Sequence, residues 1–155
     1  MITTNQLDAV FQEIVNQHIQ LKGYYSISPD KMDIDNIAVD KYPFLYAQVS
    51  NADIDEGGTT FTYDLIVADL VIEANQDINQ VLGDTQLIIQ DVLAQFIFSG
   101  ASQQFIAPEY VIELPVACTP IQYEFNNSVT GWRLRLDVRV KNATTLCDAL
   151  FTSGG

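Results

Sequence analysis

The sequence predicts an α+β domain in which a mainly antiparallel sheet of four to five strands carries two helices on one face. Residues Trp132 to Lys141 alternate between apolar and polar or charged side chains, the period-two pattern of a strand with one face in a core. Two longer segments, Thr3–Lys22 and Asn75–Phe98, repeat apolar residues every three or four positions, as amphipathic helices do. With 155 residues, we expect one domain over residues 1–155, elements in the order α-β-β-α-β-β, and a frayed tail at 152–155.

The first predicted helix runs from Thr3 to Lys22. Thr3 and Gln6 have the spacing of a capping box, and Gly23 stands where a C-terminal cap belongs. Its buried stripe is expected to consist of Leu7, Val10, Phe11, Ile14, His18 and Leu21.

Strands are expected to follow this helix. The aspartate-rich segment Tyr24–Asp40 is predicted to be an irregular connection, with a short extra strand at Tyr24–Ile27 as an alternative. A strand at Phe44–Val49 and a polar turn at Asn51–Gly58 then lead into a long strand, Thr59–Glu73. The second half of that strand is almost continuously apolar, which is typical of a strand buried on both faces. It is long for a domain of this size, so one end is expected to project.

The second half of the chain begins with the predicted helix Asn75–Phe98. Pro115 and Pro120 interrupt the strand that follows, because proline has no N–H for a ladder, and they favour an edge or kinked strand. The remaining predicted features are an interrupted strand at Tyr110–Leu114 and Ile121–Phe125, a hairpin loop at Asn126–Gly131, the strand Trp132–Lys141 and a short closing turn at Leu146–Phe151.

The chain is strongly acidic, with 20 acidic and 7 basic residues and a net charge of −13. Residues 133–141 hold four of the basic residues and one acidic residue, so the rest of the chain stands at −16. Such a charge repels a phosphate backbone, and we expect no specific binding of nucleic acid. No apolar run reaches the ~20 residues of a membrane span, and the N-terminus does not resemble a secretory signal. Cys118 and Cys147 match no zinc or redox spacing, so free thiols are expected.

The sequence contains no arrangement typical of an enzyme, so we expect no catalytic residues, no cofactor and no metal. The single histidine, His18, lies on the apolar stripe of the first helix, where a hydrogen-bonded, partly buried imidazole is expected. The segment Asp53–Gly57 loosely resembles the start of a calcium loop. The twelfth position of such a loop would be Asp64, inside a strand, so a solvated turn is expected instead.

The order of elements resembles that of the tail terminator and tail-completion (head–tail joining) proteins of long-tailed bacteriophages. The resemblance covers roughly Thr3 to Cys147. It is carried by the opening helix that ends at Gly23, the strand entry Tyr42-Pro43-Phe44, the long strand Thr59–Glu73 that feeds the second helix, and the closing hairpin of Tyr110–Phe125 with Trp132–Lys141. The long acidic connection Tyr24–Asp40 departs from such proteins and leaves the subfamily open.

The resemblance implies a virion structural protein of the tail or neck region, assembled in the host cytoplasm. Its copies would form a closed ring, expected to be a hexamer, that ends tail-tube polymerisation and joins the tail to the head or neck. The implied partners are further copies of this chain, the tail-tube protein and a head-completion, neck or portal protein, while DNA only passes through the lumen. Two alternatives remain: a head–tail connector or neck protein docking on the portal complex and, more remotely, an acidic soluble binding module.

The basic face of the last strand is the candidate subunit interface. Segregated positive charge favours contact with an acidic surface on an adjacent subunit or a tube subunit. The basic candidates are Arg133, Arg135, Arg139 and Lys141, and their candidate acidic partners are Asp33, Asp35, Asp53 and Asp55. The alternative is a solvated sheet face with pairs inside the chain to Glu113 or Glu124. The sequence leaves both interpretations open.

Overall fold

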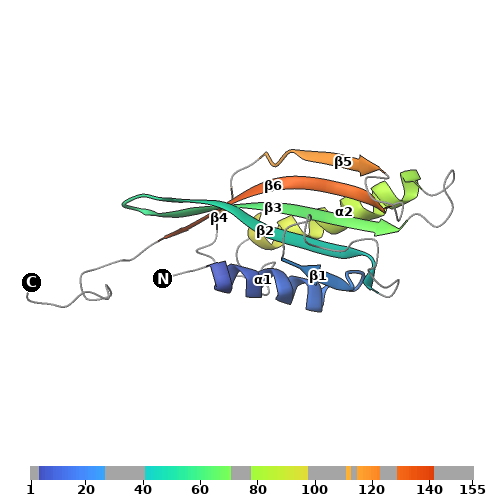
Figure 1. Cartoon of the computed structure of the whole chain (residues 1–155), viewed down its shortest axis with the longest axis horizontal. Helices are drawn as coiled ribbons and strands as arrows, with labels where there is room; N and C mark the ends of the chain where they lie inside the picture. Colours follow the sequence, from blue (N-terminus) through green and yellow to red (C-terminus); the bar gives the residue numbers. More distant parts are fainter. Residues whose placement is uncertain are drawn as a thin grey trace, which may run out of the picture.

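A computed structural model describes residues 4–26, 41–70, 78–97, 111–112, 115–122 and 129–141 of the chain. It contains two helices and a mixed sheet (Figure 1). The elements are α1 (Thr4–Gln17), β1 (Gly23–Tyr25), β2 (Phe44–Ile54), β3 (Gly58–Leu70), α2 (Ile78–Ile97), β4 (Val111–Ile112), β5 (Cys118–Gln122) and β6 (Val129–Lys141). The predicted α+β class with two helices is therefore confirmed.

The strands follow one another across the sheet in the order β1-β2-β3-β6-β4, and β5 also pairs with β6. β1 runs parallel to β2, whereas the other pairs are antiparallel. The prediction of a mainly antiparallel sheet is therefore wrong, since the sheet is mixed. The predicted element order is wrong as well, because β1 follows α1 directly and the strand broken by Pro115 counts as two elements.

α1 ends five residues earlier than predicted, and this early end makes room for β1. The His18 Nδ1 atom accepts hydrogen bonds from the backbone N–H groups of Gln20 (3.0 Å) and Leu21 (3.3 Å). A side chain that captures backbone donors in this way competes with continuation of the helix. Gly23 is consequently the first residue of β1 and not a helix cap. A Cβ atom there would lie 2.7 Å from the Lys41 carbonyl oxygen, so the close approach of two backbone segments requires glycine.

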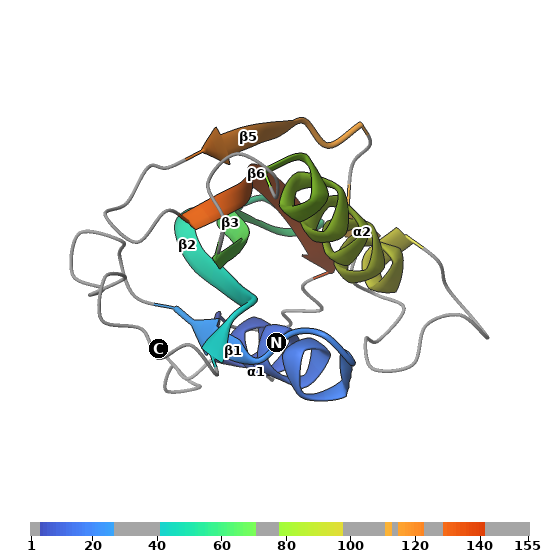
Figure 2. The ribbon, with the colours of Figure 1, turned by 90° about the vertical axis from the view of Figure 1, so that its right-hand side faces the viewer.

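Both helices pack on the same face of the sheet, as predicted, and the main core lies between them and the strands (Figure 2). α1 contributes Leu7, Phe11, Ile14 and Val15, and α2 contributes Ile88, Ile89, Val92 and Phe96. Trp132 of β6 adds a polar link, because its Nε1–H donates to the Leu82 carbonyl oxygen of α2 at 2.9 Å. The sheet side of this core consists of Leu45, Ala47, Phe61, Tyr63, Leu65, Val67, Leu134, Leu136, Val138 and Val140.

The opposite face of the sheet is apolar at one end. Its buried cluster consists of Tyr42, Phe44, Tyr46, Ile66, Ala68, Ile121 and Val129. Side chains of β3 from Leu65 to Ala68 are therefore buried on both faces, which confirms the prediction made from the continuous apolar run.

The β2–β3 hairpin is longer than predicted. β2 continues to Ile54, so most of the predicted turn is strand, and only residues 55–57 connect β2 to β3. The register shifts by one residue between Val49 and Asn51, a β-bulge at Ser50. The bulge keeps Val49 on the helix side of the sheet while Asn51 joins the polar side, which is why a polar segment can extend the strand.

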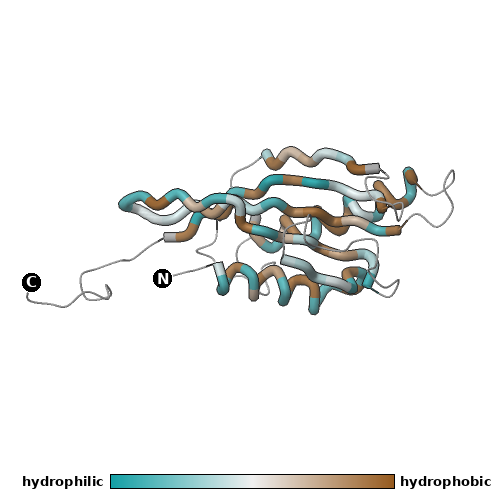
Figure 3. Tube along the Cα trace, in the orientation of Figure 1, coloured by the Kyte–Doolittle hydropathy of each residue, from teal (hydrophilic) through white to brown (hydrophobic). Residues whose placement is uncertain are grey.

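The end of this hairpin projects past α1, in agreement with the prediction for the long strand (Figure 1). We call residues 50–61 the arm. Its tip is largely hydrophilic (Figure 3), and every residue from Asn51 to Gly57 is exposed.

At the other side of the sheet, β4 and β5 both pair antiparallel with β6, at different points along its length. They form the edge strand that the two prolines predict, with Pro115 between the two pieces and Pro120 inside β5. β6 begins at Val129, three residues earlier than predicted, so Gly131 belongs to the strand and not to a loop.

Several predicted features lie outside the described residues: most of the connection Tyr24–Asp40, the first residues of the helix Asn75–Phe98, the turn Leu146–Phe151, Cys147 and the tail 152–155. Neither α1 nor α2, the helices in the described part of the chain, is long and apolar enough to cross a membrane.

Two glycines provide a matched test of this packing. A Cβ atom on Gly131 would lie 2.0 Å from the Val67 carbonyl oxygen, whereas one on Gly83 in α2 would meet nothing within 4 Å. We expect Gly131→Ala to lower the free energy of unfolding by about 3 kcal/mol or more, because the backbones of β3 and β6 must separate. Gly83→Ala should raise it by about 0.5–1 kcal/mol, the usual gain from alanine inside a helix. Urea unfolding measures both, and equal midpoints would contradict the close approach at Gly131.

Candidate functional site

Three predicted interface residues of β6, Arg133, Arg135 and Arg139, lie on the sheet face that points away from the helices. Strand register places residues of β2, β3 and β6 side by side in rows across this face. The rows are Asp53–Thr60–Arg139, Asn51–Thr62–Asp137 and Gln48–Asp64–Arg135, followed by Tyr46–Ile66–Arg133 at the border of the apolar cluster. We call the first three rows together with Arg133 the polar face.

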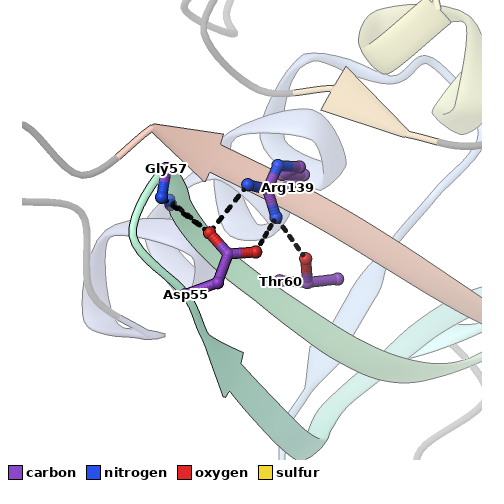
Figure 4. A network of polar contacts seen from close by, with 5 residues as sticks. Asp55, Gly57, Thr60 and Arg139 are labelled. Atoms are coloured by element: carbon purple, nitrogen blue, oxygen red, sulfur yellow. Dashed lines mark hydrogen bonds and ion pairs between the residues drawn. The ribbon is translucent and has the colours of Figure 1, made fainter.

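A bidentate contact joins Arg139 to the tip of the arm. Both oxygens of Asp55 accept hydrogen bonds from the Arg139 guanidinium at 2.9 Å, a bidentate ion pair (Figure 4). Asp55 Oδ1 also accepts from the backbone N–H groups of Gly57 (2.8 Å) and Gly58 (2.9 Å). Arg139 Nη1 donates in addition to Thr60 Oγ1 at 3.3 Å. One arginine of β6 therefore holds the turn between β2 and β3 in a fixed conformation.

This network changes the acidity of Asp55. The hydrogen bonds from Arg139, and then those from Gly57 and Gly58, favour the ionised carboxylate and lower its pKa from 3.8 to about 2.

Two further contacts cross the polar face. Arg135 Nε lies 3.6 Å from Asp64 Oδ1, and both side chains are largely exposed. The Thr62 hydroxyl donates to Asp137 Oδ1 at 2.6 Å. Exposed pairs of this kind contribute less than about 1 kcal/mol each, so they orient side chains more than they stabilise the fold.

The charges on this face of the folded sheet therefore differ from those of β6 taken alone. The basic side chains described on this face and at the adjoining turn are Arg133, Arg135 and Arg139, and the acidic ones are Asp53, Asp55, Glu56, Asp64 and Asp137. The face is a mixture of both signs and not a positive patch, because the β2–β3 hairpin brings its own carboxylates to β6. Inside the chain, Asp55 pairs with Arg139 and Asp64 pairs with Arg135. Glu113 and Glu124, the intrachain partners considered from the sequence, lie outside the described residues.

The candidate interface residues are distributed as follows. Arg139 and Asp55 contact each other, and Asp53 lies in the same row as Arg139. Lys141 is the last residue of β6, opposite Gly58. Asp33 and Asp35 lie outside the described residues. Sequence reasoning missed Asp64 as a member of the site, although the alternation of Thr60, Thr62 and Asp64 with apolar residues already placed Asp64 on a polar strand face. The period-two pattern of the last strand did place Asp137 on the same face as the basic residues.

The predicted turn at Asp55 is confirmed, since Asp55 accepts two backbone hydrogen bonds there. Its remaining acceptor capacity is directed at Arg139, a cation, which disfavours a calcium ion at the same carboxylate. No group of three or more His, Cys, Asp or Glu in the described parts of the chain could hold a metal ion.

His18 is the hydrogen-bonded, partly buried imidazole that the sequence predicts. Because Nδ1 accepts two backbone N–H groups, the ring proton of the neutral form lies on Nε2, which donates to Asp91 Oδ2 at 2.9 Å. The ring thereby connects the end of α1 to α2.

No protein-family model matches this chain, and no curated protein matches its sequence.

The acidity of Asp55 provides a test of the polar network. A carboxylate with a lowered pKa stabilises the fold above its unfolded pKa, near 3.8, and this contribution is lost as the pH falls towards about 2. We expect Asp55→Asn to destabilise the protein at pH 6, and the difference from the wild type to shrink between pH 4 and pH 2. Urea unfolding at a series of pH values measures this difference.

Arg139→Gln is the matched background for that experiment, because it removes the main cause of the shift. In this background, Asp55→Asn should have a smaller effect at pH 6. An effect of Asp55→Asn that is the same in both backgrounds would contradict the pairing.

Proposed function

We propose that this chain is a virion structural protein that forms a ring at the top of a bacteriophage tail. The ring would end polymerisation of the tail tube and join the tail to the head or neck, and DNA would pass through its lumen. The full element order differs from the predicted one, so the proposal draws on the resemblance in the opening helix, the long strand before the second helix and the closing strands. It combines this resemblance with surfaces that the fold leaves open for contacts between copies.

The observation that carries the proposal is the arm. In the arm, β3 pairs with β2 on one side and with β6 on the other, so the exposed parts of the arm are the edge of β2 and the turn at residues 55–57. An exposed strand edge offers unpaired backbone groups to another chain. Among the described residues, β1 pairs with β2 only at Phe44, Leu45 and Tyr46, so β2 from Ala47 to Ile54 has a strand on one side only. An edge of this kind can add a strand from another chain.

The charge of the chain is consistent with the proposed lumen. A net charge of −13 repels DNA, so a ring of such chains would let DNA pass with little adhesion. The polar face would then serve protein contacts. Arg139 holds the arm through Asp55. Arg133 and Arg135 are the proposed basic contacts to an adjacent subunit or tube subunit, and the side chain of Arg135 is 71% exposed beside Asp64.

The oligomeric state of the purified protein tests the proposal. Mass photometry of the wild type should give a closed ring, with a hexamer as the expected species. Arg135→Glu should weaken the ring contact at least about tenfold, because like charges then face each other in the interface. Lys41→Glu is the matched control, since it makes the same charge change on an exposed residue before β2.

A charge swap separates the proposed interface from pairing inside the chain. The double variant Asp64→Arg/Arg135→Glu rebuilds the intrachain pair with reversed polarity. It should remain defective in assembly if Arg135 meets another subunit. If the swap variant forms rings as the wild type does, Arg135 pairs only with Asp64 of its own chain and does not contact another subunit.

The two alternatives give different results in the same measurements. Rings that bind portal complexes but do not cap tail tubes would identify a connector or neck protein. A wild-type chain that stays monomeric would contradict the proposal and favour an acidic binding module.

A further inference from the structure

Three large apolar side chains are exposed in the described part of the chain: Ile19 at 89%, Ile54 at 77% and Leu87 at 59%. Single exposed apolar residues are normal on a protein surface. Here, however, two of them, Ile19 and Leu87, line the same cleft, and the third lies at the tip of the arm.

The cleft lies between the end of α1 and the middle of α2 and has a volume of about 600 Å³. Its lining includes Ile14, His18, Ile19, Leu87, Asp91 and Ala94. The two sides are linked by the hydrogen bond between His18 Nε2 and Asp91 Oδ2. His18 also fixes the turn after α1 through the N–H groups of Gln20 and Leu21, so Ile19 is held outward by a defined structure. The cleft is therefore preformed, with apolar side chains at its rim.

The tip of the arm is fixed as well. Ile54 is the last residue of β2 and lies opposite Thr59 of β3. The next residue, Asp55, is bound by Arg139 and by two backbone N–H groups. Ile54 is thus presented to solvent on a rigid turn, which lowers the entropy lost when it binds.

One chain cannot bring the two surfaces together. The arm projects beyond the start of α1, whereas α1 runs away from the arm and ends near β1 (Figure 1). A contact between the tip and the cleft therefore joins two copies through different surfaces, a head-to-tail contact that closes into a ring when the rotation between copies allows.

We propose that Ile54 of one copy inserts into the α1–α2 cleft of the next copy, between Ile19 and Leu87. This inference rests on the proposed ring and names the contact between its subunits. One isoleucine covers too little area for a stable interface, so the insertion positions a larger contact that includes the polar face and the edge of β2.

One pair of exposed residues of opposite charge accompanies the two surfaces, while the Asp91 carboxylate also lines the cleft, where it is bonded to His18. Lys22 is exposed next to the cleft, and its Nζ donates to the Ile19 carbonyl oxygen at 3.4 Å. Glu56, two residues after Ile54, is exposed at the tip. In the proposed contact, the carboxylate of Glu56 pairs with the ammonium of Lys22.

Cysteine cross-linking of single-site variants tests the contact directly. Chains carrying Ile54→Cys are mixed with chains carrying Leu87→Cys, allowed to exchange subunits and oxidised. The mixture should give covalent dimers, whereas each variant alone should give no more cross-link than the wild type, which controls for the native cysteines. The double variant should give a ladder of covalent oligomers up to the size of the ring.

The possible outcomes separate this inference from the proposed function. Dimers from Ile54→Cys alone would mean that two tips meet each other, and this would overturn the inference. Rings in which the mixture forms no cross-link would overturn it while leaving the proposed function intact. A wild-type chain that stays monomeric would overturn both.

Variants without cysteine substitutions support the same test. Ile54→Asp should weaken ring assembly at least about tenfold, since it replaces the apolar side chain by a carboxylate that meets Asp91 in the cleft, whereas Ala9→Asp, at an exposed position of α1 outside the cleft, should not. Glu56→Lys should weaken assembly, and adding Lys22→Glu should restore it. A double variant that assembles no better than Glu56→Lys would overturn the charge pairing.

Discussion

The pairing of β3 with β6 is the constraint on which the rest of the structure depends. The two strands are in register from Gly58 opposite Lys141 to Leu70 opposite Val129, along the full length of both. At Gly131 the strands approach so closely that a Cβ atom would lie 2.0 Å from a carbonyl oxygen of β3. A slip of one residue would exchange the two faces of β6, moving its arginines into the core and its apolar side chains out.

The same register decides what the polar face can do. It sets Arg139 beside Thr60 and within reach of Asp55, and it sets Arg135 opposite Asp64. Charges that look segregated along one strand are thus compensated within the sheet. What remains open to partners is a mixed-charge surface, a strand edge and an arm held rigid by one ion pair. These features favour recognition between defined protein surfaces over attraction of any acidic ligand.

The sequence predicted the elements whose patterns are long and periodic. It was less successful where single contacts determine at which residue an element begins or ends. The stripes of α1 and α2 and the alternation of β6 reflect burial of whole faces. The early end of α1 depends on His18 capturing two backbone groups, and the extension of β2 depends on a bulge at Ser50, neither of which periodicity reveals. The alternating pattern of β6 identified the basic residues of the site. It did not identify Asp64 as the partner of Arg135, because the register between two strands is a tertiary property.

Hydrogen exchange compared at low and high protein concentration tests the central claim, that β3–β6 pairing builds the monomer while the arm serves contacts between copies. Amides in the middle of β3 and β6 should exchange slowly at both concentrations, since they are paired within each chain. Amides between Asn51 and Ile54 that point to the open edge of β2 should exchange rapidly in dilute protein and become protected under conditions that favour assembly, whereas the Asp55 amide, bonded to the Gly58 carbonyl oxygen within the chain, should not change. Open-edge amides whose exchange does not depend on concentration, although rings form, would contradict this account.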